Sequence, residues 1–375
     1  MTGDAHEPVT YAGAGVDVEA GDRAVELMRE WVARTRRPEV VGELGGFAGL
    51  FDASALRHYR RPLLATSTDG VGTKVQIAQR MDRHDTIGFD LVGMVVDDIV
   101  VAGAEPLFMT DYIACGSVVP ERIAALVKGI AEACVVAGCA LTGGETAEHP
   151  GLLGPDEYDV AGAVTGVVEA DEVLGPDRVR PGDVLVAMAS SGLHSNGYSL
   201  VRRVLDRAGW ELDRHVDELG RRLGEELLEP TRVYAQDVLD LVRAGRSDGI
   251  DVHAVSHVTG GGLAANLARV LPRRLEAVVD RSTWTPAAIF SLVRRLGSVP
   301  LADLERTLNV GVGMVAVVAA DGADAAVARL GPRGVPAWVL GEVREARPDD
   351  AEGDLTQGAK GVDGGAVRMV GSQQV

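Results

Sequence analysis

Short apolar runs that end in glycine-rich turns alternate along this chain with longer, mostly apolar or amphipathic stretches. Residues 62–69 form one such run, which predicts a strand entering a tight turn. Residues 90–106 predict an apolar helix that ends at Gly103. A second helix is predicted over 120–138, with proline at its start and glycine at its stop. Residues 139–146 then predict a strand followed by two glycines and an acid.

The second half of the chain repeats this alternation. Residues 184–192 predict a strand, and a helix starts within 195–205. Residues 251–271 predict a strand, three glycines and another helix. Further strands are predicted over 310–320 and 337–343. Strands that alternate with helices in this way indicate an α/β or α+β layered fold.

The length of 375 residues favours two domains, because single hydrophobic cores rarely grow beyond roughly 250–300 residues. We expect a flexible N-terminus over 1–20 and an N-terminal domain over 21–175. A proline- and glycine-rich hinge then begins a C-terminal domain over 176–346. The last segment, 347–375, is polar and glycine-rich, which predicts a flexible tail.

Composition and charge argue against several classes of protein. The formal net charge is −18 and no long basic cluster is present, which argues against a general nucleic-acid binder. The three cysteines Cys115, Cys134 and Cys139 form no CxxC motif, so we expect reduced, buried thiols. There is no N-terminal signal pattern and no apolar run of 18 residues. The sequence therefore predicts a cytoplasmic protein without a membrane partner.

Several acids follow the predicted strands or lie on the predicted helix. Asp69, Asp98 and Glu145 form a candidate magnesium set, because Mg²⁺ prefers carboxylate oxygens. A buried Asp98 in an apolar helix would need a cation or an arginine. Asp97 and Asp111 are reserve ligands. The alternative, an N-cap role for Asp69 and ion pairs for the others, stays open.

Two glycine clusters suit the binding of an anion by backbone N–H groups. One is Gly260–Gly262, directly before a predicted helix, and the other is the segment 190–197 around His194. Tight turns and N-caps are the alternative reading of both. Lys74 is either a phosphate contact or a solvated loop lysine. His253 and His257 have zinc-like spacing, but no suitable third ligand is evident.

An ordered set of motifs then points to a known family. The motifs include TDGVGTK, GAEPLFMTDY, LTGGETAEHPG, SSGLHSNGYSLVR and HVTGGGLAANLARVLP. Together they resemble the phosphoribosylformylglycinamidine cyclo-ligase (aminoimidazole ribonucleotide synthetase) family from about Gly13 to Val343. Asp97 stands where asparagine is frequent in the family, and Arg29 where lysine is common.

The resemblance implies an ATP-dependent ligase of purine biosynthesis that closes the imidazole ring of aminoimidazole ribonucleotide and releases ADP and phosphate. It implies two α/β domains, with N-terminal domains pairing as a homodimer around a shared β-barrel and a C-terminal mixed sheet packed with helices. It implies ATP with Mg²⁺ and leaves the role of K⁺ open. The alternative is another ATP-dependent enzyme of the same superfamily, similar to thiamine-monophosphate kinase.

The resemblance also assigns roles to individual residues. The nucleotide set, which includes a loop that closes over the site, is Gly45, Gly46, Phe47, Asp69, Gly70, Gly72, Thr73, Lys74, Asp98, Gly143, Gly144 and Glu145. The substrate set is Ser191, Gly192, His194, Ser195, Asn196, Gly197, Thr259, Gly260, Gly261 and Gly262. The catalytic candidates are Lys74, His194 and His257, and the metal ligands are Asp69, Asp98 and Glu145.

Overall fold

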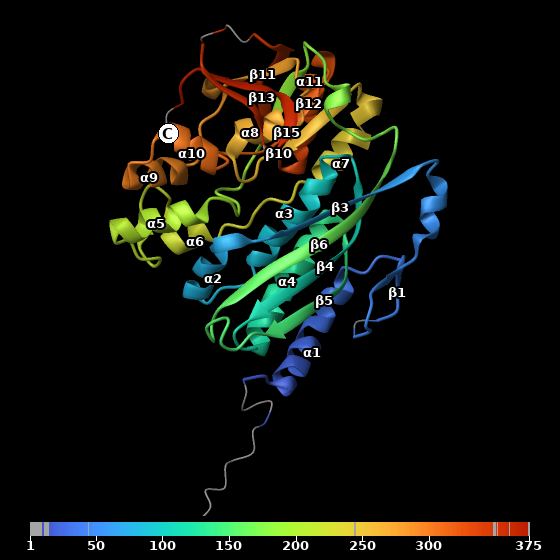
Figure 1. Cartoon of the computed structure of the whole chain (residues 1–375), viewed down its shortest axis with the longest axis vertical. Coiled ribbons are helices and arrows are strands. Elements are labelled where there is room, and N and C mark those ends of the chain that lie inside the picture. Colours follow the sequence, from blue (N-terminus) through green and yellow to red (C-terminus); the bar gives the residue numbers. More distant parts are fainter. Residues whose placement is uncertain are drawn as a thin grey trace, which may run out of the picture.

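The chain folds around two separate β-sheets, each with its own helices (Figure 1). The computed structural model describes residues 10, 15–43, 45–243, 245–347, 350, 352–359 and 361–373. Most of the predicted flexible N-terminus lies outside these ranges. No helix within them is long and apolar enough to span a lipid bilayer.

The N-terminal sheet has four strands in the order β3-β6-β4-β5. β6 is antiparallel to both of its neighbours, whereas β4 and β5 are parallel. Their bounds are β3 (Pro62–Gly70), β6 (Tyr158–Glu169), β4 (Glu105–Cys115) and β5 (Ala140–Glu148). Two strands therefore separate β3 from β5, which fixes how far apart their side chains lie.

Helices cover one face of this sheet. α3 (Ile87–Val100) packs on β3 and β6, and α4 (Pro120–Ala137) packs on α3. α1 (Val18–Arg34) lies against α4, and α2 (Val75–Met81) follows the turn after β3. The opposite face carries exposed side chains, among them Leu64, Tyr112 and Ala163. That face has no covering layer in the described part of the chain.

The C-terminal sheet is mixed, as the sequence predicts. Its order is β10-β12-β7-β13-β11-β15-β14, and β11 and β15 form its one parallel pair. The bounds are β10 (Val252–His257), β12 (Val312–Val318), β7 (Val184–Ala189), β13 (Ala337–Glu345), β11 (Leu275–Asp280), β15 (Val362–Val370) and β14 (Asp354–Ala359).

One apolar core joins the two domains. It runs from the helices over the N-terminal sheet to one face of the C-terminal sheet, and a second core fills the other face of that sheet. Two short antiparallel strand pairs lie outside these sheets. β1 (Val40–Val41) pairs with β2 (Leu50–Phe51), and β8 (His215–Val216) pairs with β9 (Arg221–Arg222). The C-terminal helices are α5 (Tyr198–Ala208), α6 (Leu223–Leu227), α7 (Ala235–Arg243), α8 (Gly262–Ala268), α9 (Ala288–Gly297), α10 (Leu301–Thr307) and α11 (Ala323–Leu330).

The prediction of a flexible C-terminal tail is wrong for the residues that the structure describes. β14 and β15 extend the sheet, and Arg368 of β15 is 1% exposed. Its guanidinium donates to Glu276 at 3.2 Å and to the carbonyls of Arg347, Asp350 and Glu352. The local sequence is polar, but its order depends on a carboxylate nearly 100 positions away.

His253 of β10 gives the fold a pH-dependent contact. Its Nδ1 lies 2.7 Å from Asp183 and its Nε2 lies 3.2 Å from Asp251. The hydrogen bond to Asp183 raises the pKa of His253 above its usual value. A raised histidine pKa stabilises the fold fully below the pKa of the unfolded chain, near 6.5, and this contribution is lost as pH rises through the folded pKa.

We therefore expect His253→Gln to lower the free energy of unfolding by roughly 1–2 kcal/mol at pH 6, and by less as pH rises to 9. Urea unfolding of both proteins across this range measures the difference. His215→Gln, at an exposed histidine near Asp217, is the matched control and should show no such trend. A His253 difference that grows with pH would contradict the assignment.

Candidate functional site

A cavity of about 440 Å³ lies between the domains, where β3 ends and α5 begins. It joins the two segments that the sequence singles out most clearly. Their lining residues are Asp69, Gly70, Val71, Gly72 and Thr73 from the first segment, and Ser195, Asn196, Gly197, Tyr198 and Ser199 from the second. Met94 and Asp159 complete the wall.

Hydrogen bonds hold these two segments together. Ser195 Oγ donates to the carbonyl of Val71 at 3.2 Å, and the hydroxyls of Thr73 and Ser199 lie 3.2 Å apart. The third predicted segment also reaches this place, because a Cβ added to Gly260 would lie 3.2 Å from Asn196 Oδ1. Two loops from distant parts of the sequence thus line one cavity, and a third lies beside Asn196 in its wall.

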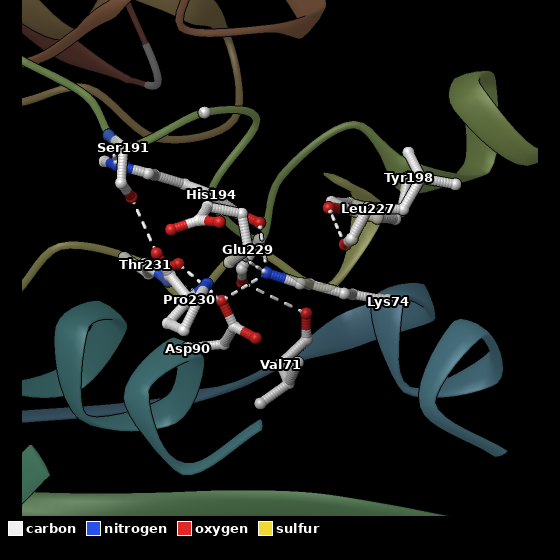
Figure 2. A network of polar contacts seen from close by, with 12 residues as sticks. Val71, Lys74, Asp90, Ser191, His194, Tyr198, Leu227, Glu229, Pro230 and Thr231 are labelled. Carbon is white, nitrogen blue, oxygen red and sulfur yellow. Dashed lines mark hydrogen bonds and ion pairs between the residues drawn. The ribbon is translucent and has the colours of Figure 1, made fainter. Parts of the chain in front are cut away.

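A buried lysine lies beneath these loops (Figure 2). Lys74 Nζ is 2.7 Å from Asp90 Oδ1 and also donates to the carbonyls of His194 and Glu229, at 3.0 and 2.7 Å. Asp90 Oδ1 accepts two further bonds, from the backbone N–H and the hydroxyl of Thr231. Lys74 and Asp90 belong to the N-terminal domain and their other partners to the C-terminal one, so this pair ties the domains together.

Both charges of this pair are fully buried. Burial lowers the pKa of Lys74 and raises the pKa of Asp90, because it disfavours each charged form. Asp90 Oδ2 has no partner among the described residues. The expectation that the Lys74 ammonium faces phosphate is not met in this structure, since its three N–H groups all bind protein oxygens.

His194 lies in the same region but is 3% exposed. Its φ of 60° is left-handed, and its Nε2 accepts the backbone N–H of Ser191 at 3.1 Å. Burial, with the nearby His257 and Lys74, holds the pKa of His194 well below its usual value. His194 is therefore neutral with its proton on Nδ1, so Nε2 is not free to act as a general base.

The two adjacent acids of α3 have opposite environments. Asp97 is completely buried and accepts the N–H of Tyr234, and burial raises the pKa of its carboxyl to about 7. Asp98 is 41% exposed and its Oδ1 lies 2.9 Å from His257 Nδ1. The expected burial of Asp98 thus applies to Asp97 instead, because one residue along a helix rotates a side chain by about 100°.

A second cavity, of about 270 Å³, contains other predicted nucleotide residues. Gly45, Gly46 and Gly143–Glu145 line it under α1, together with Asp111. Burial raises the pKa of Asp111 to about 7. Gly144 is required here, because a Cβ at this position would lie 2.2 Å from Asp111 Oδ1. Phe47 is fully exposed and lines neither cavity.

The three predicted magnesium ligands do not form one set within this chain. Asp69 pairs with Gly162, and Tyr112 pairs with Glu145, on strands β3, β6, β4 and β5 in that order. With strands about 4.8 Å apart, the Asp69 and Glu145 backbones lie roughly 14 Å apart. In the described ranges no three histidine, cysteine or carboxylate side chains are placed to hold a metal ion.

The other predicted substrate residues take part in loop structure. Ser191 Oγ donates to the carbonyl of Pro230 at 2.6 Å, and Asn309 Nδ2 donates to the carbonyl of Gly192 at 2.9 Å. Gly262 N–H donates to the carbonyl of Thr259 at the start of α8. Sequence reasoning missed the site roles of Asp90, Thr231 and Asn309.

Comparison with known families accounts for most of the chain. Residues 51–168 match the family "AIR synthase related protein, N-terminal domain". Residues 180–352 match "AIR synthase related protein, C-terminal domain". The boundary between the two matches falls in the segment between the two sheets.

Curated relatives are similar over nearly their whole length. A phosphoribosylformylglycinamidine cyclo-ligase of Geobacillus kaustophilus (strain HTA426) is 51% identical over 334 residues, which cover 89% of this chain and 95% of the relative. One from Anaeromyxobacter sp. (strain Fw109-5) is 52% identical over 337 residues, covering 89% and 96%.

Solved structures share the fold at lower identity. Thiamine-monophosphate kinase from Stenotrophomonas maltophilia K279a has a TM-score of 0.61 at 19% identity, covering 86% of this chain and 94% of its own. The hydrogenase maturation protein HypE, solved in complex with ATP, has a TM-score of 0.59 at 20% identity, covering 88% of each chain. These likenesses show the fold alone.

Proposed function

Because the chain belongs to the phosphoribosylformylglycinamidine cyclo-ligase family, we propose that it forms 5-aminoimidazole ribonucleotide by way of a phosphorylated formyl oxygen. The family makes the chain an ATP-dependent ligase of purine biosynthesis. Its substrate is 2-formamido-N1-(5-phospho-D-ribosyl)acetamidine. The thiamine-monophosphate kinase alternative fits less well, since that likeness is at 19% identity.

One observation carries the proposal: the segments 69–73 and 195–199 together line the interdomain cavity, and Gly260 lies beside Asn196. Backbone N–H groups of glycine turns bind phosphate groups without steric hindrance. The negative net charge of the chain does not oppose this, because local N–H groups, and not the net charge, contact the ligand.

We propose two chemical steps. The formyl oxygen attacks the γ-phosphorus of ATP, forming an O–P bond while the bond to ADP breaks. The amidine-derived nitrogen then attacks the formyl carbon, the C–O bond breaks, and phosphate leaves as the nitrogen loses a proton. His257 is suited to receive this proton through Nε2, because Asp98 holds its Nδ1 at 2.9 Å.

We further propose that the active enzyme is a homodimer. The predicted nucleotide residues divide between two cavities, and the strands that carry them are roughly 14 Å apart in one chain. A second chain packed on the uncovered face of the N-terminal sheet would bring further residues to that face. Because the carboxylates form no common metal site, we derive no step from magnesium.

The test is turnover by the full chain with ATP and the formylglycinamidine ribonucleotide, followed through the aminoimidazole product. We expect one ADP and one phosphate per ring closed. A His257→Gln variant should retain nucleotide binding and lose most of the turnover. Nucleotide binding by the wild-type chain without any ring closure would overturn the proposal.

A further inference from the structure

A separate cavity of about 440 Å³ lies in the C-terminal domain and shares no lining residue with the interdomain cavity. Leu263 of α8, Glu305 of α10 and Thr356 of β14 contribute to its walls. β14 begins at residue 354, beyond residue 352 where the match to the family's C-terminal domain ends. Of the predicted substrate residues, Gly261 lines this cavity, whereas Ser195, Asn196 and Gly197 line the interdomain one.

A buried guanidinium forms part of its charged wall. Arg281 is 4% exposed and binds Glu305 through Nε at 2.6 Å and through Nη2 at 2.9 Å. It also binds Asp354 at 2.7 Å and the carbonyl of Met369 at 2.9 Å. Arginine has five N–H groups, so one remains on Nη1 without an acceptor among the described residues.

The lining indicates the chemistry of an occupant. Arg281 and Arg306 balance Glu305 and Asp354, so neither an anion nor a cation gains from the local charge. Trp284 and other apolar side chains, Leu263 and Met369, complete the wall. Apolar walls with a few hydrogen-bonding groups suit a flat, uncharged ring.

The cavity also contacts a strained turn that leads to the substrate loop. Val310 has a φ of 48°, which is unusual for a β-branched residue, and its carbonyl accepts the Nε1–H of Trp284 at 2.9 Å. The preceding Asn309 donates to the carbonyl of Gly192 and accepts from Ser190 Oγ. Asn309 also lines this cavity, so a molecule against Trp284 and Val310 lies beside the residue that holds the 190–192 turn.

We propose that this cavity binds an uncharged planar heterocycle with both N–H donors and ring-nitrogen acceptors, of the size of a nucleobase or nucleoside. Trp284 and the apolar residues contact the ring faces. Glu305 and Asp354 accept from the ring's N–H groups, and the spare N–H of Arg281 donates to a ring nitrogen. Occupancy holds the Val310 turn and, through Asn309, the 190–192 turn.

Calorimetric titration of the full chain with adenosine tests this binding. A non-hydrolysable ATP analogue is kept at saturation, so that adenosine cannot report on a nucleotide site. We expect one adenosine to bind per chain. The result does not depend on whether the chain turns over the proposed substrate.

Two cavity-filling variants, Ala265→Trp and Thr356→Trp, place a new ring in this space from α8 and from β14. Each should weaken adenosine binding at least tenfold, and the second guards against a folding defect in the first. Hydrogen exchange at 190–194 should slow with adenosine in the wild-type chain only. No binding at millimolar adenosine, or binding that both variants retain, would overturn the proposal.

Discussion

Replacing Asp90 by Asn should destabilise the protein more than any other single change that preserves side-chain shape. The variant leaves the Lys74 ammonium fully buried without a counter-charge. The loss of stability cannot exceed the free energy of deprotonating Lys74, because the variant can fold with that lysine neutral. The ordinary pKa of lysine is about 10.4. That limit is about 4–5 kcal/mol at pH 7 and about 2 kcal/mol at pH 9, at about 1.36 kcal/mol for each pH unit.

Lys74→Met should show the opposite pH dependence. It leaves the Asp90 carboxylate buried without a counter-charge, and the variant can fold with that carboxyl group protonated instead. The ordinary pKa of aspartate is about 3.9. The cost is then limited to about 4 kcal/mol at pH 7 and about 1.5 kcal/mol at pH 5. The directions agree with the lowered pKa of Lys74 and the raised pKa of Asp90 in the folded chain.

Urea unfolding of both variants between pH 5 and 9 measures these costs. The double variant Asp90→Asn/Lys74→Met should lose less stability than the sum of the two single losses, because no buried charge is left alone. Asp85→Asn, on an exposed and loosely paired acid, is the control and should change stability by less than about 0.5 kcal/mol. Parallel pH profiles for the two single variants would exclude a buried charged pair.

Local pattern was sufficient to predict much of the fold. The apolar run ending in TDGVGTK became β3, and the proline and glycine at the ends of α4 mark its first residue and its cap. Strands β7 and β12 also lie within their predicted ranges. In each case adjacent residues carry the information, through apolar runs and the backbone preferences of glycine and proline.

The errors arose where distant residues decide the outcome. Arg368 holds the C-terminal segment through its ion pair with Glu276. The sequence around position 368 does not indicate that Glu276 is the partner. The sequence offered Lys74 as a phosphate contact or a solvated loop lysine, because the residues whose oxygens bind it in the fold, Asp90, His194 and Glu229, lie far from it in the sequence. Proximity of the loops in the interdomain cavity could be inferred from strand ends, but the direction of each side chain could not.

Asp69→Asn should have the largest effect on activity. Asp69 is exposed in the interdomain cavity, and its only described contact is the N–H of the next residue, Gly70, at 2.7 Å. Its charge therefore serves no ion pair in the fold and is available to the proposed nucleotide reaction. We expect kcat/KM for ATP to fall by roughly 100-fold or more, because Asp69 would hold the magnesium ion that the resemblance implies, and the nucleotide would then lose that cation at its phosphates.

Asp159 supplies a matched control. It lines the same cavity from the neighbouring strand β6, and its carboxylate likewise accepts the next N–H, that of Val160, at 2.9 Å. Asp159→Asn removes the same charge from the same cavity, yet the resemblance assigns Asp159 no metal, nucleotide or catalytic role, so kcat/KM should change by less than about threefold. Neither variant should lower the unfolding midpoint by more than about 2 °C, because neither carboxylate is buried. Equal losses in both variants would mean that the cavity needs negative charge in general and that Asp69 has no specific role.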